Sequence, residues 1–430
     1  MRIHRIHPLH QASRWLLFLL MACLMTFGHR AEGVEVTIGC GGGGADKAMC
    51  FQYAQQWALK TGNTVKNFSP PGSFNEKLAL YRQLFAAHSS DLDVLPIDVT
   101  FPAVLKDHLL DLKPYTKGLE NDHFANMIAI NTLNDRLIAL PWFSDAGVLY
   151  YRADLLKKYG RRVPQTWDEL TATATAIQAA ERQAGRADFH GFVFQGKASE
   201  GLACNALEWI YSNGGGALMD AQGNITINNP HAAEALNRAA QWVGTITPSG
   251  VLNYEEEDTR GVFQTGHALF MRNWPYAWSL AQKPDSPVRG LVGIAKLPGS
   301  AQGPGVGTLG GWSLAVSRYS HHPAEAADLA LYMTSAAVQK QRAIEGSLNP
   351  SRPALFQDPE VMSAIGDAAI LADVLKTAVV RPTNITGFKF PQVSQNFYNA
   401  ASDVLAQRTS GEEAVKKLAT RFKRIKRESW

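Results

Sequence analysis

The charged residues best placed to bind a ligand are two aspartates and one arginine. Asp98 ends an apolar-rich segment, Asp145 lies within the segment Phe143–Tyr151, and an arginine, Arg381, immediately precedes a proline. A carboxylate accepts two hydrogen bonds and a guanidinium donates in a fork, so these groups suit a ligand dense in hydroxyl groups. A structural role is the alternative for each. The aspartates could cap a helix or hold a turn, and the arginine could form an ion pair.

Aromatic residues supply candidate walls for such a site. Five of them fall within the conspicuous motifs of the chain: Trp142, Trp274, Tyr276, Trp278 and Trp312. In a cleft open to water, aromatic rings stack on the C–H-rich faces of a ring-shaped ligand and bury a large area. We expect Trp274, Tyr276 and Trp312 to contact the ligand, and Trp142 and Trp278 to pack. Core packing is the alternative for the first three as well.

No cluster of residues predicts a metal, a cofactor or a catalytic centre. The loop Gly41–Gly44 lacks the GxxxxGK[ST] pattern of a phosphate-binding loop. The pair His321-His322 precedes a proline and is typical of a turn. Of the cysteines beyond the N-terminal segment, Cys40 and Cys50 would close the shortest loop if two of them paired in an oxidising compartment, and Cys204 is the third. Three small buried apolar residues are the alternative.

The N-terminal segment predicts export. A basic stretch over 1–14 precedes an apolar core over 15–27, which is short for a bilayer span, and small residues follow. We therefore predict a cleaved signal peptide over 1–33 and a periplasmic protein. Alternatively, Leu20–Cys23 resembles a lipobox, and acylation at Cys23 would tether the protein to a membrane. The apolar run continues past this cysteine, which favours simple cleavage.

Net charge excludes some partners at the level of the whole chain. The formal net charge is +4, and segment 1–33 holds +3 of it through four arginines and one glutamate. A near-neutral remainder gives no electrostatic reason to expect nucleic acid or acidic lipid as a partner. The basic run from Arg421 to Arg427 predicts the solvated face of a last helix.

Strands and helices alternate along the N-terminal part. A strand over 34–38 precedes an amphipathic helix, a short strand over 65–68, a helix opened by a capping box at Ser73–Glu76, and a buried strand over 91–99. This order predicts a parallel α/β sheet. With 430 residues, 46% of them hydrophobic, the chain is long enough for two well-packed lobes.

Later segments predict further elements and a crossing between lobes. Asn134-Asp135 predicts a hairpin turn, and Thr166–Glu169 is a capping box that opens a long helix. The glycine-rich stretch Gly303–Gly311 joins two predicted strands, the second over 313–317, and suits a passage from one lobe to the other. One helix is expected over about 323–344.

Five motifs together resemble one protein family. They are Asp91–Asp98, Phe143–Tyr151, Phe263–Tyr276, Gly310–Ser317, and Arg381-Pro382 followed by Tyr398. Their order and spacing are similar to those of the extracellular sugar-binding proteins of ABC importers, in the trehalose/maltose-binding branch of the family 1 solute-binding proteins. The resemblance covers essentially everything from Val34 onward. It implies an α/β, two-lobed periplasmic binding protein fold of type II, with the ligand cleft between lobes joined by a hinge.

The resemblance also bears on residues and lobes. It implies a ligand contact at Glu256, in the acidic run Glu255–Asp258, and contacts at Gly310 and Gly311, which we place just before a strand. Lys77 and Arg82 are weaker candidates. Family members commonly carry Trp where this chain has Thr100-Phe101-Pro102, which alters one stacking wall. We expect lobe 1 to comprise 34–143 plus about 306–355, and lobe 2 to comprise 144–305 plus about 356–430.

The function implied is transport and not catalysis. The expected protein is a monomer that captures a disaccharide, trehalose or maltose, by lobe closure and delivers it to an ABC transporter permease. It needs no cofactor and binds no nucleic acid. One alternative is the same fold with another solute, such as a glycerol phosphodiester, a polyol or another oligosaccharide. The other is an exported glycoside hydrolase, which needs two carboxylates. The chain lacks eightfold βα repetition, and few basic groups converge on a phosphate.

Overall fold

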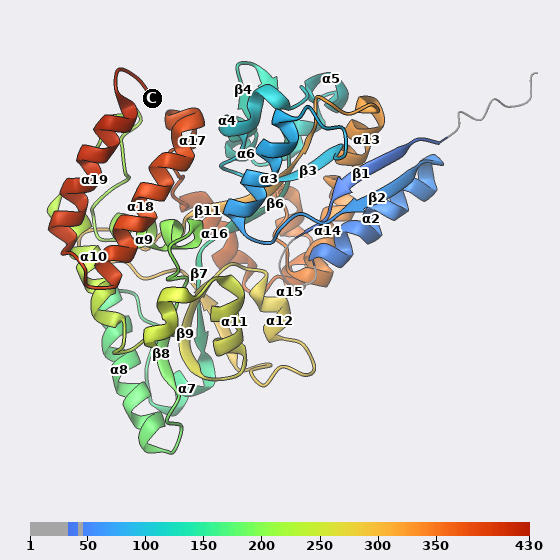
Figure 1. The fold of residues 1–430 in the computed structure, drawn as a ribbon. Coiled ribbons are helices and arrows are strands. Elements are labelled where there is room, and N and C mark those ends of the chain that lie inside the picture. The colour runs from blue at the N-terminus through green and yellow to red at the C-terminus, as the bar shows by residue number, and fades with distance from the viewer. Residues whose placement is uncertain (1–32, 42–45) are drawn as a thin grey trace, which may run out of the picture.

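The computed structural model describes residues 33–41 and 46–430. Within them the chain forms two halves, each built on its own β-sheet (Figure 1). The predicted signal peptide up to residue 32, the alternative acylation site at Cys23, and most of the predicted glycine loop over 41–44 lie outside the described residues. No helix in the described part is long and apolar enough to cross a bilayer.

The first half is built on a mixed five-stranded sheet. Its strands are β1 (Glu35–Gly39), β2 (Thr64–Phe68), β3 (Val94–Asp98), β6 (Leu140–Ala146) and β11 (Leu309–Val316). They lie in the order β2-β1-β3-β11-β6. Strands β1, β2 and β3 are parallel, as predicted, because a helix follows each of the first two. The parallel arrangement ends at β11, which runs antiparallel to both β3 and β6.

The second half is built on a four-stranded sheet. Its strands are β7 (Val148–Arg152), β8 (His190–Val193), β9 (Ala268–Asn273) and β10 (Val292–Ala295). They lie in the order β10-β7-β9-β8, with β8 parallel to β9 and β7 antiparallel to both of its neighbours.

A small hairpin lies apart from the two sheets. It pairs β4 (Thr132–Leu133) with β5 (Arg136–Leu137). The turn residues Asn134 and Asp135 have φ of 51° and 60°. Positive φ at both central positions is the geometry of a type I′ turn, which Asn and Asp tolerate, so the predicted turn is confirmed.

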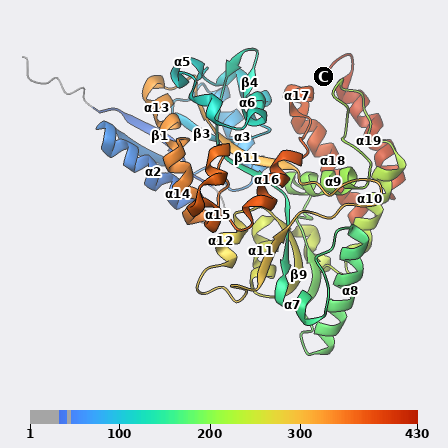
Figure 2. The ribbon, with the colours of Figure 1, turned by 180° about the vertical axis from the view of Figure 1, so that it is seen from behind.

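Helices cover both sheets, and the two views show the same division into halves (Figures 1 and 2). The helices packed with the first sheet and its loops are α2 (Asp46–Thr61), α3 (Phe74–Ala86), α4 (Pro102–Leu105), α5 (Lys113–Thr116), α6 (Ala125–Asn131), α13 (Pro323–Met333) and α14 (Ala336–Gly346). Met49, Tyr53 and Trp57 of α2 pack with α13 and β1 in one apolar core. The helical spacing of these three residues is the reason for that buried face.

The second half is richer in helix. Its helices are α7 (Ala153–Lys158), α8 (Trp167–Gln183), α9 (Glu200–Ser212), α10 (Pro230–Trp242), α11 (Glu256–Gln264), α12 (Ala277–Ala281), α17 (Thr383–Thr386), α18 (Phe390–Leu405) and α19 (Gly411–Lys426). Helices α8, α9, α10, α18 and α19 share the largest core cluster with β8 and β9. Between the halves lie α15 (Pro359–Ala364) and α16 (Ala368–Thr377), whose apolar residues pack with residues of both sheets.

Five short 3₁₀ helices complete the described elements. They are η1 (Lys106–His108), η2 (Leu119–Asp122), η3 (Ser249–Asn253), η4 (Pro353–Gln357) and η5 (Gly387–Lys389). Near the N-terminal end, a disulfide joins Cys40, just after β1, to Cys50 in α2. Cys204 is a free, buried cysteine in α9. The pairing that closes the shortest loop is therefore the one present.

Gly147 lies where the chain passes from one sheet to the other, between β6 and β7. A Cβ at this position would lie 2.2 Å from Oε1 of Glu208, so a side chain does not fit. Gly307, in the predicted crossing stretch, lies against the backbone of Gly147. Two crossings therefore run side by side through the centre of the molecule, which places the cavity described below beside them. The assignment of chain segments to lobes stays a prediction.

Two helix predictions need correction. The single helix expected over 323–344 is two helices, α13 and α14, because Ser335 leaves helical geometry and its hydroxyl caps α14 by accepting from the backbone N–H of Val338. Ser73 stands at the N-cap of α3 but does not accept the capping hydrogen bond expected of it. At α8 the cap is as predicted, since Thr166 accepts from the N–H of Glu169 at 3.2 Å.

Candidate ligand-binding site

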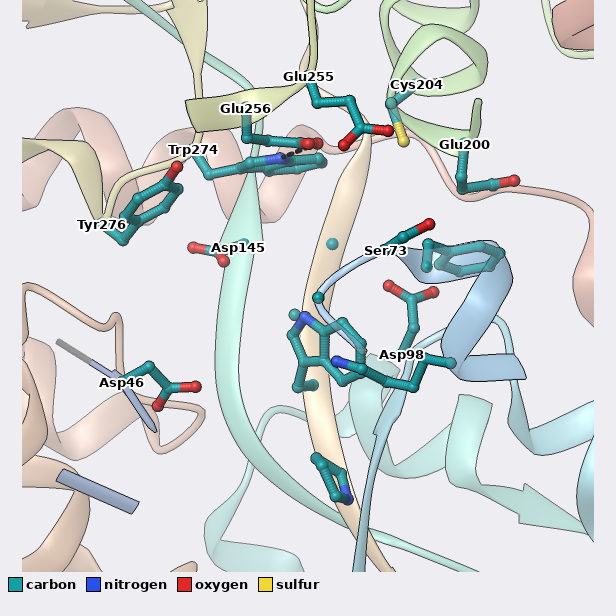
Figure 3. A pocket seen from close by; sticks show the side chains of 18 of the residues that line it. Asp46, Ser73, Asp98, Asp145, Glu200, Cys204, Glu255, Glu256, Trp274 and Tyr276 are labelled. Carbon is teal, nitrogen blue, oxygen red and sulfur yellow. Dashed lines mark hydrogen bonds between the residues drawn. The ribbon is translucent and has the colours of Figure 1, made fainter. Parts of the chain in front are cut away.

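A cavity of about 470 Å³ lies between the two sheets, with walls from both halves (Figure 3). All of the residues predicted as ligand contacts line it: Asp98, Asp145, Glu256, Trp274, Tyr276, Gly310, Gly311, Trp312 and Arg381. Lys77 and Trp142 line it too, whereas Arg82 is exposed on α3 and lies outside it. The cavity volume falls within the roughly 300–1,000 Å³ range of small-molecule sites.

Trp274 forms the wall contributed by the second half. It directly follows β9, and its indole N–H donates to Oε1 of Glu256 at 3.3 Å (Figure 3). A Cβ at Gly310 would lie only 2.9 Å from Cζ3 of this ring, so the missing side chain leaves room for it. Behind the ring, the guanidinium of Arg272 lies 4.1 Å from its centroid and pairs with the buried Glu208. These contacts fix the plane of the indole.

Trp312 forms the wall contributed by the first half. The ammonium of Lys77 lies 4.0 Å from its ring centroid, and Phe101 meets the ring edge-on at 6.2 Å. Burial lowers the pKa of Lys77 to about 8, although the nearby carboxylates of Asp46 and Asp98 oppose the shift. Family members commonly carry Trp where this chain has Thr100-Phe101-Pro102. In this chain Phe101 is fully buried, and it supports the Trp312 ring from behind.

Gly310 and Gly311 lie inside β11 and not before a strand, which corrects the prediction. Gly310 pairs with Asp145 and Gly311 with Ser144 of β6. Gly311 has φ of 108°, and a Cβ there would lie 2.6 Å from the carbonyl oxygen of Phe143. The register shifts just beyond, after Trp312. The glycines therefore allow a distorted strand to run along the cavity floor.

Asp145 points into the middle of the cavity (Figure 3). Burial raises its pKa to about 8, with Arg272 opposing the shift and Asp46 adding to it. Its Oδ1 is buried and has no hydrogen-bond partner in the protein. The carboxyl group is thus largely protonated at neutral pH and can both donate and accept, where the sequence predicted an acceptor.

Arg381 connects carboxylates that come from the two halves. It lies 3.3 Å from Asp98, at the end of β3, and 2.9 Å from Glu200, at the start of α9. Its side chain also donates to the carbonyl of Leu309. Asp98 accepts from the backbone N–H and the hydroxyl of Thr100. The structural ion pair considered for Arg381 is therefore present, and direct contact of Arg381 with a ligand stays a prediction.

Tyr276 and Trp142 occupy the side of the cavity nearer α2. The hydroxyl of Tyr276 donates to Glu257 at 2.6 Å. Trp142 is 1% exposed and lies under Arg342, whose guanidinium is 3.7 Å from the ring centroid, so it packs as predicted while touching the cavity. Trp278 packs in the core between the halves and is not among the cavity residues.

Sequence reasoning missed several residues of this cavity. Asp46 opens α2 and pairs with the buried Arg342, Glu200 pairs with Arg381, and Ser73 and Asn75 reach the cavity from the start of α3. The first turns of these helices were the available signal, since strand-to-helix junctions converge on ligands in α/β folds. Nothing in the sequence ties Glu200 to an arginine far along the chain.

Carboxyl groups outnumber cations in the lining of the cavity. Its described lining holds eight carboxyl side chains and two cations, Lys77 and Arg381. Most of these carboxylates pair with cations, such as Asp46 with Arg342 and Glu200 with Arg381, so the lining offers many acceptors to hydroxyl groups and few free cations to a phosphate. Together with opposed indoles, the site suits a neutral polyhydroxylated molecule with flat C–H-rich faces.

Residues 51–340 match the family described as bacterial extracellular solute-binding protein. A Deinococcus radiodurans protein named "Probable ABC transporter-binding protein" is 46% identical over 93% of this chain and 96% of its own length. The chain belongs to this family. It is accordingly a solute-binding protein of the ABC transporter type and not an enzyme, which removes the glycoside hydrolase alternative.

Solved structures agree on the fold. Maltose-bound MalE3 of T. maritima superposes with a TM-score of 0.87, is 37% identical, and covers 91% of this chain and 100% of its own. Among relatives found by sequence alone, the mannitol-binding protein of Pseudomonas aeruginosa is 25% identical over 47% of this chain and 46% of its own length. The two-lobed periplasmic binding protein fold is therefore confirmed, and the two sheets are the cores of the first and second lobes.

Proposed function

We propose that this exported solute-binding protein captures a disaccharide, with maltose or trehalose as the ligand, and delivers it to an ABC transporter permease. The observation that carries the proposal is the pair of indoles, Trp274 and Trp312, that line one cavity from opposite lobes. Each offers a flat apolar face to one ring of a two-ring ligand. The maltose in MalE3, the structure 37% identical to this chain, supports this choice of ligand.

Carboxyl groups between the indoles supply the hydrogen bonds. Asp98 and Asp145 lie on the first-lobe side, and Glu256 lies beside Trp274 on the other. A hydroxyl that misses its partner leaves a buried polar group unpaired, so these residues select among sugars. The lining holds only two cations, Lys77 and Arg381, and Arg381 is already paired with two carboxylates, which argues against a glycerol phosphodiester. A polyol is the second candidate, because the Pseudomonas aeruginosa relative is named a mannitol-binding protein.

Transport follows from closure of the lobes. A sugar that touches both lobes binds the closed state more tightly than the open state, and this difference shifts the population towards closure. The closed protein, a periplasmic monomer, would then dock on the permease. No bond of the ligand is broken in this cycle.

Isothermal titration calorimetry tests the proposal. The chain is purified from Val34 onward, because every described helix and strand follows that residue. It is titrated with maltose, trehalose, mannitol and glycerol-3-phosphocholine. We expect one-to-one binding of maltose or trehalose, and at least tenfold weaker binding by both Trp274→Ala and Trp312→Ala.

Trp430→Ala is the matched control, because this tryptophan packs at the C-terminal end against Gly223 and lies outside the cavity. It should leave the affinity unchanged. If only mannitol gave a binding signal, the fold assignment would stand and the proposed ligand would be a polyol instead of a disaccharide. If Trp430→Ala lost as much sugar affinity as the two cavity variants, the proposed position of the ligand between the indoles would be contradicted.

A further inference from the structure

The last helix concentrates the positive charge of the protein. Helix α19 carries six cations and two glutamates, a net +4, which equals the formal net charge of the entire chain. All the other residues therefore sum to zero. Five of the cations on α19, and Arg427 just beyond it, are exposed: Lys416, Lys417, Arg421, Lys423, Arg424 and Arg427.

This basic face is held rigidly at the outer edge of the second lobe. In both views α19 lies at the outer edge with α18 beside it on the inner side, and it contacts α18 and α10 (Figures 1 and 2). Its opposite face is buried, with Val415, Leu418 and Phe422 in the lobe core. The C-terminal end is fixed as well, because Lys426 and Trp430 both donate to the carbonyl of Gly223.

The basic face has little internal compensation. On α19 the structure shows one ion pair within the described residues, between Lys417 and Glu413 at 3.1 Å. The exposed parts of the neighbouring helix α18 are mainly neutral amides, such as Gln392, Gln395 and Asn399. Few carboxylates lie nearby, namely Glu412, Glu428 and Asp220, so most of the field of the cations extends into the solvent.

We infer that the basic face of α19 docks on an anionic lipid surface. Four to eight Lys and Arg residues on one amphipathic helix are enough to attract such a surface, by charge alone. A protein partner would need apolar anchors at the centre of its contact. The large exposed apolar residues of the described chain lie off α19, namely Leu59, Leu119, Tyr211, Met362, Val380 and Phe388. Of these, Phe388 lies near the C-terminal end of α19, because the adjacent Lys389 donates to the carbonyls of Lys426 and Ser429. A face made only of charge suits lipid headgroups better than a protein.

The net charge of the whole chain hides an uneven distribution of charge over the molecule. A near-neutral sum gave no reason to expect acidic lipid, but one molecule carries both a cleft lined with carboxyl groups and a basic outer face. Docking would keep a loaded protein near a membrane-embedded permease, and this role rests on the proposed function. The lipid contact itself does not depend on the sugar.

Vesicle co-sedimentation tests the inference with the chain from Val34 onward. The vesicles are pure phosphatidylcholine, or phosphatidylcholine with one quarter phosphatidylglycerol. At low salt the protein should bind the anionic vesicles and not the neutral ones, and about 0.5 M NaCl should release it. Neutralising Lys416, Arg421, Lys423 and Arg424 together to Gln should weaken binding at least tenfold.

A charge-matched control neutralises four exposed cations elsewhere on the second lobe, Lys157, Arg161, Arg162 and Arg289, again to Gln. It should bind anionic vesicles like the unchanged protein. Equal losses in the two variants would overturn the inference, and so would failure to bind anionic vesicles at low salt. Binding to an immobilised acidic peptide with no binding to vesicles would assign the face to a protein partner instead. Sugar affinity, measured separately, should be the same in both variants.

Discussion

At the scale of single residues, cations behind aromatic rings organise the candidate site. Three indoles of the cavity each have a cation over one face: Trp312 with Lys77, Trp274 with Arg272, and Trp142 with Arg342. Two of these cations are further held by buried carboxylates. A cation fixed on one face is attracted by the quadrupole of the ring and keeps its plane in place. The cavity is thereby shaped before any ligand arrives, which lowers the ordering cost of binding.

Asp145 gives the first prediction at this scale, on stability against pH. Its folded pKa of about 8 lies above the ordinary value near 4, because burial disfavours the charged form. Between these two values the folded protein keeps a proton that the unfolded chain has lost. The free energy of unfolding should therefore fall as pH rises from about 4 to 8, by up to about 1.4 kcal/mol per unit from this group. Asp145→Asn should remove that contribution and be the more stable protein at pH 7.

Urea unfolding of the ligand-free protein at pH 4.5, 6 and 7.5 measures this effect. The difference in the free energy of unfolding between Asp145→Asn and the unchanged protein should widen with pH. Asp285→Asn, at an exposed aspartate, is the control and should show no such trend. A constant difference across the three pH values would contradict a protonated Asp145.

Residue-level prediction from the sequence succeeded where a residue sits at the end of an element. Asp98 was placed at the end of a strand, and it lines the cavity where β3 ends. Glu200 was missed because its partner Arg381 lies 181 positions away along the chain. A contact of that kind depends on how the lobes meet, which local patterns of polarity do not encode.

At the scale of elements, the disulfide between Cys40 and Cys50 holds the first strand to the first helix. The bridge closes a short loop and so lowers the entropy of the unfolded chain. In the chain-entropy description, a loop of this size stabilises the folded protein by about 2–3 kcal/mol. We predict that Cys40→Ser/Cys50→Ser lowers the free energy of unfolding by about this amount. The same helix starts at Asp46, so sugar affinity should fall as well.

Unfolding in urea with and without dithiothreitol measures the contribution of the bridge. Dithiothreitol should lower the urea concentration at the unfolding midpoint of the unchanged protein. It should not change the midpoint of the double serine variant. Cys204→Ser is a useful second variant, since this buried thiol is not bridged. A reductant effect of equal size in all three proteins would show that the bridge is not its cause.

Element-level predictions failed where tertiary contacts override a local preference. Glycine disfavours strands, so Gly310 and Gly311 were assigned to a loop, yet both pair with β6 inside β11. The indole of Trp274 and the backbone of Phe143 occupy the space that side chains at these positions would need. The helix break at Ser335 was missed for a related reason, because the apolar period continues across α13 and α14 while the axis changes.

At the scale of the whole molecule, one buried cation joins the two lobes. Arg381 lies between Asp98 of the first lobe and Glu200 of the second, and all three side chains are at least nine-tenths buried. Without this cation, two carboxylates would face each other across the cleft with little water. The ion pairs hold the two lobes in the arrangement that this structure shows, and they need no ligand to do so.

Arg381→Met should therefore open the ligand-free protein and weaken sugar binding together. Small-angle X-ray scattering should give a larger radius of gyration, and the free energy of unfolding should fall by about 3–5 kcal/mol, since two buried carboxylates lose their partner. Apparent affinity for maltose should fall because part of the binding free energy is then used to close the lobes. Adding Glu200→Gln removes one of the two unpaired charges and should restore much of both properties. If Arg381 instead donates directly to the sugar, as the sequence predicted, the double variant would stay weak in binding while its radius of gyration matched that of the unchanged protein.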